Sequence, residues 1–156
     1  MCKNLNIKVQ IFHSSSIFSA AIGESCLDIY KFGPTTTITN WSKNYTPTSF
    51  LDVIEKNLKN NQHTLVLFDI IKDQERTLSF EEAIKIIQKA EEKTKKNLLE
   101  NRKIILLSNI GSKNSRILYS EINKISNKIE ETSKNCIIIP SETTFAEKEL
   151  LELFNS

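Results

Sequence analysis

Thr64-Leu-Val-Leu-Phe-Asp-Ile70 is a nearly continuous apolar run, and it is one of three such runs that decide the fold class of this 156-residue chain. The other two are Ile104-Ile-Leu-Leu-Ser-Asn-Ile110 and Cys136-Ile-Ile-Ile-Pro140. Short apolar runs of this kind are typical of strands that are covered on both faces of a sheet. We therefore expect three central strands of one sheet.

Two weaker strands and several helices are predicted between and around these runs. Residues 7–12 are apolar, and Thr35–Thr39 alternates and is rich in threonine, which suits an edge strand. Helices are predicted from Pro47-Thr-Ser49, from a capping box of Ser79 and Glu82, over residues 115–129 (Ile117, Leu118, Ile122, Ile125 and Ile129 on one face), and over residues 144–154 (Phe145, Leu150, Leu151 and Phe154 inward). Strands that alternate with helices predict an α/β fold.

The segment from Gly33 to Pro47 is a predicted domain junction. It contains a glycine-proline step, several threonines and a polar run around Trp41. We place the boundary near residue 34. Residues 1–33 supply one strand and one short helix, too little for a core of their own, and are expected to be the remnant of an N-terminal α/β domain. Residues 34–156 are expected to form a C-terminal α/β domain.

Composition argues against several classes of protein. The 21 basic and 19 acidic residues are interspersed, so no concentrated basic surface for nucleic acid is predicted. Cys2, Cys26 and Cys136 are far apart and form no metal-ligand pattern, which is typical of reduced thiols in a cytosolic protein. No apolar run is long enough for a membrane span, and the three glycines form no phosphate-binding loop. We expect a cytoplasmic protein that binds no metal, membrane or nucleic acid.

Four stretches together resemble one family, the diphthine synthases. They are Ile11-Phe-His-Ser-Ser-Ser-Ile-Phe-Ser-Ala20, Leu27-Asp-Ile-Tyr-Lys-Phe-Gly33, Pro47-Thr-Ser-Phe-Leu-Asp-Val-Ile54 preceded by Trp41, and His63-Thr-Leu-Val-Leu-Phe-Asp-Ile70. They follow in the family's order and nearly at its spacing. The C-terminal half agrees more loosely, through Ile110-Gly-Ser112 and through Ile139-Pro140 followed by Glu147 and Leu151. The resemblance covers residues 7–154, and the family's first domain, with its Gly-Gly-Asp-Pro loop, has no counterpart.

The resemblance implies an architecture and a cofactor. The family is similar to tetrapyrrole methylases, in which S-adenosyl-L-methionine lies in a cleft between two α/β domains. This chain would then contain the C-terminal domain with a mixed sheet, plus the last strand and helix of the N-terminal domain. The implied cofactor contacts are Ser16, Ile17, Phe68, Ile110 and Asn135, the last standing where the family usually has histidine. Ser16 offers a hydrogen bond, and Ile17, Phe68 and Ile110 offer apolar walls.

The implied activity is methylation of the amino group of the 3-amino-3-carboxypropyl-histidine of translation elongation factor 2. We expect the chain to be the C-terminal half of a split enzyme that works with a separately encoded N-terminal half, and to be capable of forming a homodimer. The methyl group of a sulfonium is already activated, so alignment can supply much of the acceleration and no acid or base is required. The sequence therefore assigns no catalytic residue.

Three departures from the family pattern leave a second reading open. Asn109 stands where the family has arginine, and Asn135 and Thr144 stand where it has histidine. They are consistent with weakened substrate handling or with drift that has no consequence, and the alternative function is a non-catalytic interaction domain or a truncated, inactive fragment. For His63 a hydrogen bond to a loop is favoured over catalysis, whereas Asp69 is equally consistent with ligand contact and with capping a loop.

Overall fold

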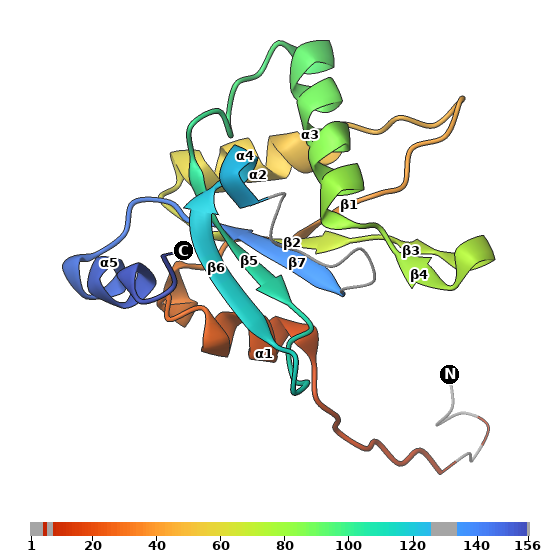
Figure 1. The fold of residues 1–156 in the computed structure, drawn as a ribbon. Helices are drawn as coiled ribbons and strands as arrows, with labels where there is room; N and C mark the ends of the chain where they lie inside the picture. Colours follow the sequence, from red (N-terminus) through yellow and green to blue (C-terminus); the bar gives the residue numbers. More distant parts are fainter. Residues whose placement is uncertain (1–4, 6–7, 126–133, 156) are drawn as a thin grey trace.

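A five-stranded sheet forms the centre of the computed structural model, which describes residue 5 and residues 8–125 and 134–155 (Figure 1). Its order is β1 (Thr36–Ile38), β2 (Thr64–Phe68), β7 (Asn135–Ile139), β5 (Lys103–Ser108), β6 (Arg116–Glu121). β1 runs parallel to β2, and every other neighbouring pair is antiparallel, so the sheet is mixed. The three long apolar runs are the three central strands, and the threonine-rich run is an edge strand, which confirms these predictions and the α/β class.

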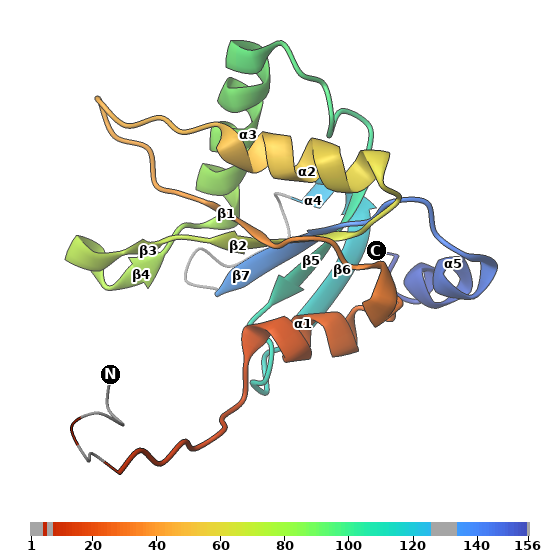
Figure 2. The same cartoon turned by 180° about the vertical axis from the view of Figure 1, so that it is seen from behind.

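Helices cover both faces of the sheet (Figures 1 and 2). On one face lie α2 (Ser49–Lys59), α3 (Phe80–Thr94) and the single-turn α4 (Ile122–Ile125), and on the other lie α1 (Ile17–Glu24) and α5 (Phe145–Glu152). Because side chains alternate along a strand, β5 sends Ile104 and Leu106 to the first face and Ile105 and Leu107 to the second. The sheet thus separates two apolar cores, as expected for strands buried on both sides.

The first two predicted helices begin where the sequence placed them. α2 follows Pro47 and Thr48, and its apolar stripe is buried at Phe50, Leu51 and Ile54. At α3 the hydroxyl of Ser79 accepts from the backbone N–H of Glu82, whose carboxylate accepts from the backbone N–H of Ser79. This is the predicted capping box, which satisfies two N–H groups that a helix start leaves without partners.

The strand predicted over residues 7–12 is wrong for the part of it that the structure describes. Residues 8–16 have no regular secondary structure and extend away from the sheet (Figure 2), with Ile11 and Phe12 74% and 80% exposed. A strand needs a neighbour to satisfy its backbone groups, and none of the described strands lies beside this segment. The described sheet therefore gives this apolar segment no partner.

The helix predicted over residues 115–129 is also wrong. Residues 116–121 form strand β6, paired with β5 over six positions from Lys103↔Glu121 to Ser108↔Arg116. Of the described residues in this span, only Ile122–Ile125 is helical, with Ile122 and Ile125 buried as predicted; residues 126–129, with Ile129, lie outside the described residues. A short turn after β5 brings the next residues back along its free edge, and pairing with that edge outweighs the helical spacing of the isoleucines.

The last helix was predicted in the right place with part of its inward face wrong. α5 buries Leu151, but Phe145 is 76% and Leu150 42% exposed. The inward position one turn before Leu151 is taken by Glu147, which is buried. A carboxylate therefore occupies the stripe that apolar spacing alone assigned to Phe145.

Smaller elements complete the fold. The 3-10 helix Ile29–Lys31 precedes β1, and a hairpin of β3 (Ile70–Ile71) and β4 (Arg76–Thr77), joined by the 3-10 helix Lys72–Gln74, projects beside β2 (Figure 1). Helix α1 buries Ala21 in the same apolar cluster as Leu65 and Ile138. In the structure, α1 therefore packs on the sheet of residues 34–156, while the domain boundary near residue 34 remains a prediction. No helix among the described residues is long and apolar enough to cross a membrane.

Candidate cofactor-binding cavity

A cavity of about 610 Å³ opens at one end of the central strands, where β2 and β5 end and β7 begins. β2 and β5 are both antiparallel to β7, so their carboxyl ends meet at this end, where ligands of α/β sheets gather. The residues that line it come from α1, from these strands and from the loops that follow them: Ile17, Leu67, Phe68, Ile70, Thr77, Leu107, Asn109, Ile110, Gly111, Ser112, Lys134, Asn135 and Cys136.

Four of the five predicted cofactor contacts line this one cavity. Ile17, Phe68, Ile110 and Asn135 are far apart in the sequence, and the fold brings them together. Ser16 is the exception. Its side chain is the N-cap of α1, where Oγ accepts from the backbone N–H of Phe18 at 3.3 Å, and it does not line the cavity.

The lining combines apolar and polar side chains. Leu67 and Leu107 add to the apolar Ile17, Phe68 and Ile110, and Ser112 and Lys134 add to the polar Asn135. Sequence reasoning did not select the added residues. Leu67 and Leu107 lie within runs that were recognised as strands, but a continuous apolar run does not reveal which side chains face a cavity. Lys134 comes immediately before β7, a position at which a polar side chain is expected at the sheet edge.

Asn109 holds the ends of two strands together at the rim of the cavity. Its backbone N–H donates to the carbonyl of Lys134 at 2.8 Å, and its side-chain Oδ1 accepts from the backbone N–H of Lys134 at 2.9 Å. Its φ of 52° lies in the left-handed region, which asparagine tolerates better than most residues. Asn109 therefore fixes the backbone at the rim of the cavity.

The titratable groups among the described lining residues are the thiol of Cys136 and the amine of Lys134. Cys136 is buried, and burial raises the pKa of its thiol to about 12, so the thiol stays neutral. No carboxylate or imidazole is found among the described residues that line the cavity. The described part of the chain also contains no cluster of His, Cys, Asp and Glu that could hold a metal ion. The arrangement can bind and orient a ligand.

A buried polar cluster lies at the opposite end of the central strands and is structural. His63 is fully buried, and its Nδ1 accepts from the backbone N–H of Ser141 at 3.0 Å, while Nε2 lies 3.2 Å from Oε1 of Glu147. Burial lowers the pKa of His63 and keeps the ring neutral. Glu147 also accepts from the backbone N–H groups of Asp28 and Thr144, at 3.0 and 2.7 Å. The favoured reading of His63, a hydrogen bond to a loop, is confirmed.

Thr144 and Asp69, two other residues singled out in the sequence, have local roles. The hydroxyl of Thr144 caps α5 by accepting from the backbone N–H of Glu147. Asp69 is half-buried and accepts from the backbone N–H of Asn40 at 3.0 Å, which is the loop-capping alternative. Neither residue lines the cavity.

Comparison with known proteins identifies close relatives along nearly the whole chain, although no family model matches it. It is 38% identical over 147 residues to the diphthine synthase of Methanococcus maripaludis strain S2, and 36% identical over 149 residues to that of Methanosphaera stadtmanae. The diphthine synthase of Methanocaldococcus jannaschii is 33% identical over 153 residues. These matches cover 94–96% of this chain but only 57–59% of the relatives.

Solved structures give the same result. A protein of Entamoeba histolytica assigned as a diphthine synthase superposes with a TM-score of 0.89 at 26% identity, over 99% of this chain and 63% of that one. A second diphthine synthase structure, at 19% identity and a TM-score of 0.80, supports the fold alone. In sequence and in fold, the chain matches the C-terminal part of the diphthine synthases.

Proposed function

We propose that the cavity at the end of β2 and β5 binds S-adenosyl-L-methionine and that the chain is part of a diphthine synthase. The carrying observation is that Ile17, Phe68, Ile110 and Asn135, selected from the family resemblance, line one cavity. The substrate in this proposal is the 3-amino-3-carboxypropyl-histidine of translation elongation factor 2, whose amino group receives the methyl groups.

The chemistry of the lining fits the cofactor. The volume of the cavity lies within the range of about 300–1,000 Å³ that is usual for small-molecule sites. The apolar side chains of Ile17, Phe68 and Ile110 suit adenine and the methionine chain. The amide of Asn135 and the hydroxyl of Ser112 suit the ribose hydroxyls. Lys134 places a positive charge where a carboxylate can be paired.

In this proposal the chain's own residues bind and orient. The cofactor supplies a methyl group already activated on a sulfonium. Phe68 and Ile110 keep water from one side of it, and the rim held by Asn109 fixes the depth of the site. Since no described lining residue is a base, proton removal from the acceptor amine falls to solvent or to residues outside this cavity.

The chain spans less than two thirds of its relatives, so the cleft is completed elsewhere in this proposal. The missing wall is an N-terminal α/β domain, joined to the boundary near residue 34 in a longer polypeptide or supplied by a separate chain. Residues 8–16 lead towards it as an extended segment, and exposed Ile11, Phe12 and Phe18 are apolar surface that such a domain covers.

Calorimetric titration tests this proposal. The chain is co-expressed with the N-terminal domain of a diphthine synthase, and the purified complex is titrated with S-adenosyl-L-methionine. We expect binding in the micromolar range and methylation of elongation factor 2 that carries the modified histidine. A stable complex that binds no cofactor would overturn the proposal.

Matched variants connect that binding to the cavity. Ile110→Ala removes apolar wall and is expected to weaken cofactor binding about tenfold, as loss of a buried aliphatic contact costs on the order of 1.4 kcal/mol. Leu153→Ala removes a side chain that is 76% exposed near the C-terminus, away from the cavity, and should leave binding unchanged. Equal affinities of the two variants would place the cofactor elsewhere.

A second candidate is a non-catalytic interaction domain. The observation in its favour is that Asn109 and Thr144, which replace residues of the family pattern, both fix local backbone structure. In that case the complex binds elongation factor 2 and transfers no methyl group, which the same methylation assay distinguishes.

A further inference from the structure

A second, polar cavity lies at the other end of the central strands. Its volume is about 360 Å³, and its walls are the start of β5, the middle of β6 and the loop after β7. Arg102, Lys103, Tyr119, Ser141 and Thr143 carry the polar and charged groups used below. β5 runs from this cavity at Lys103 to the cofactor-binding cavity at Leu107, so the two sites lie at opposite ends of one strand.

Two cations of this cavity have no ionic partner. The Arg102 guanidinium donates from Nε to the carbonyl of Leu98 at 3.0 Å and from Nη1 to that of Pro140 at 3.4 Å. Lys103 Nζ lies 5.0 Å from the ring centre of Tyr119. Neither cation forms an ion pair within residues 8–125 and 134–155. Carbonyl and ring contacts hold both groups in place and leave their positive charge uncompensated.

The acidic groups nearby do not neutralise these cations. Glu100 lines the cavity as a carboxylate; it accepts from the side-chain amide of Asn97 and forms no ion pair with either cation among the described residues. Glu121 pairs across the strands with Lys103 in register, yet its carboxylate lies 2.9 Å from Nζ of Lys124. The described lining has the two cations Arg102 and Lys103 against the one carboxylate of Glu100, so it keeps an excess of positive charge next to its hydroxyl groups.

The loop that closes the cavity is fixed. The backbone N–H of Ser141 donates to Nδ1 of buried His63, and its Oγ lies 3.2 Å from the same nitrogen. This bond fixes Ser141, two residues before Thr143, and the Ser141 hydroxyl donates to the same nitrogen. The hydroxyl of Thr143 and the two cations are the groups that can donate to a ligand.

We propose that this cavity binds the phosphate group of a small phosphomonoester. A guanidinium, an ammonium and the hydroxyl of Thr143 match the several acceptor oxygens and the double charge of phosphate better than they match a neutral or cationic ligand. The cavity is larger than free phosphate, and the ring of Tyr119 and Pro140 offer apolar surface to the rest of the ligand. The site is independent of the methyl transfer proposed above.

Nuclear magnetic resonance titration of the full chain tests the proposal, with inorganic phosphate and then phenyl phosphate as probes and acetate as the comparison. We expect saturable shifts at the amides of residues 101–103, 119 and 141–143, and tighter binding of phenyl phosphate than of acetate. Shifts spread over all exposed lysines, or equal binding of acetate, would overturn it.

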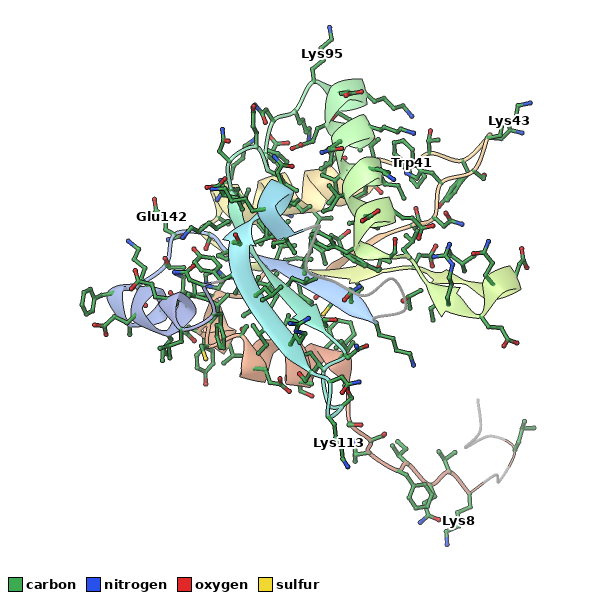
Figure 3. The ribbon with its side chains drawn as sticks, in the orientation of Figure 1. Lys8, Trp41, Lys43, Lys95, Lys113 and Glu142 are labelled. Atoms are coloured by element: carbon green, nitrogen blue, oxygen red, sulfur yellow. The ribbon has the colours of Figure 1, made fainter. Side chains whose placement is uncertain are left out.

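Charge variants provide the control. Arg102→Gln and Lys103→Gln should each weaken phosphate binding roughly fivefold or more, the effect of losing one charge-assisted contact. Lys43→Gln removes an equal charge at the tip of a distant loop (Figure 3) and should change nothing. Lys103→Arg keeps the charge and should keep binding, which separates loss of the site from misfolding. Equal weakening by Lys43→Gln and Lys103→Gln would mean that phosphate responds to net charge alone.

Discussion

Gly33 is a residue whose identity is dictated by one neighbour. A Cβ added there would lie 2.4 Å from Oδ1 and 2.6 Å from Cγ of Asn57. Asn57 cannot easily move, because it is buried and its amide donates to the carbonyl of Pro34 and to Oγ1 of Thr64, each at 2.9 Å. We predict that Gly33→Ala lowers the free energy of unfolding by about 1–3 kcal/mol, the usual cost of overpacking. Urea denaturation measures it.

The same substitution at Gly23 is the control. Gly23 lies in helix α1, and a Cβ there would have nothing within 4 Å. Because alanine favours a helix over glycine by roughly 0.5–1 kcal/mol, Gly23→Ala should be neutral or slightly stabilising. If both variants lost the same stability, crowding against Asn57 would not be the reason for glycine at position 33.

His63 has a defined tautomer. Its Nδ1 accepts from the backbone N–H of Ser141, so the proton of the neutral ring must lie on Nε2, where it donates to Glu147. We predict nitrogen chemical shifts of the neutral Nε2–H form at pH 7, measured on the labelled protein by long-range proton-nitrogen correlation. A proton found on Nδ1, or a charged ring at pH 7, would contradict this assignment.

At the scale of single elements, helix α5 depends on its N-terminal cap. The hydroxyl of Thr144 and the carboxylate of Glu147 each accept from the other residue's backbone N–H. We predict that Thr144→Ala destabilises the protein by about 1 kcal/mol in thermal or urea unfolding, and that Thr144→Ser does not, since serine keeps the acceptor oxygen. A loss shared by the serine variant would point to the methyl group of Thr144.

The elements also show what sequence patterns can and cannot predict. Strands β2, β5 and β7 could be predicted from the sequence because burial on both faces of a sheet requires continuous apolar residues. β6 could not be predicted, since Ile117 and Leu118 also fit a helical stripe and only the free edge of β5 decides between the two structures. At the candidate site, the family resemblance selected Ile17 and Phe68. Leu107 and Lys134 were missed because their place depends on which strands are neighbours.

At the scale of the whole molecule, hydrogen bonds of the Glu147 carboxylate connect the segments that contain Asp28, His63 and Thr144. They also make the stability of the protein depend on pH. Glu147 is 4% exposed. Burial alone would raise its pKa, but the N–H groups of Asp28 and Thr144 and the ring of His63 outweigh it and lower the pKa from 4.5 to about 2. The contribution of ionised Glu147 to the free energy of unfolding is present above pH 4.5 and is lost as pH falls towards 2. The lowered pKa of His63 acts in the same direction from about pH 6.5 downwards, because the unfolded chain takes up the proton first.

We therefore predict that the free energy of unfolding, measured with urea at pH 7, 5 and 3, falls on acidification, with Glu147 supplying at most about 3 kcal/mol of the loss. Glu147→Gln should destabilise the protein at pH 7, because its amide offers only one acceptor oxygen to the N–H groups that the carboxylate serves. It should also flatten the fall between pH 5 and 3. Glu142→Gln, at an exposed neighbouring carboxylate, should stay within about 0.5 kcal/mol of the parent at pH 7. If Glu147→Gln kept the parent's full pH slope, the acid sensitivity would have to come from other carboxylates.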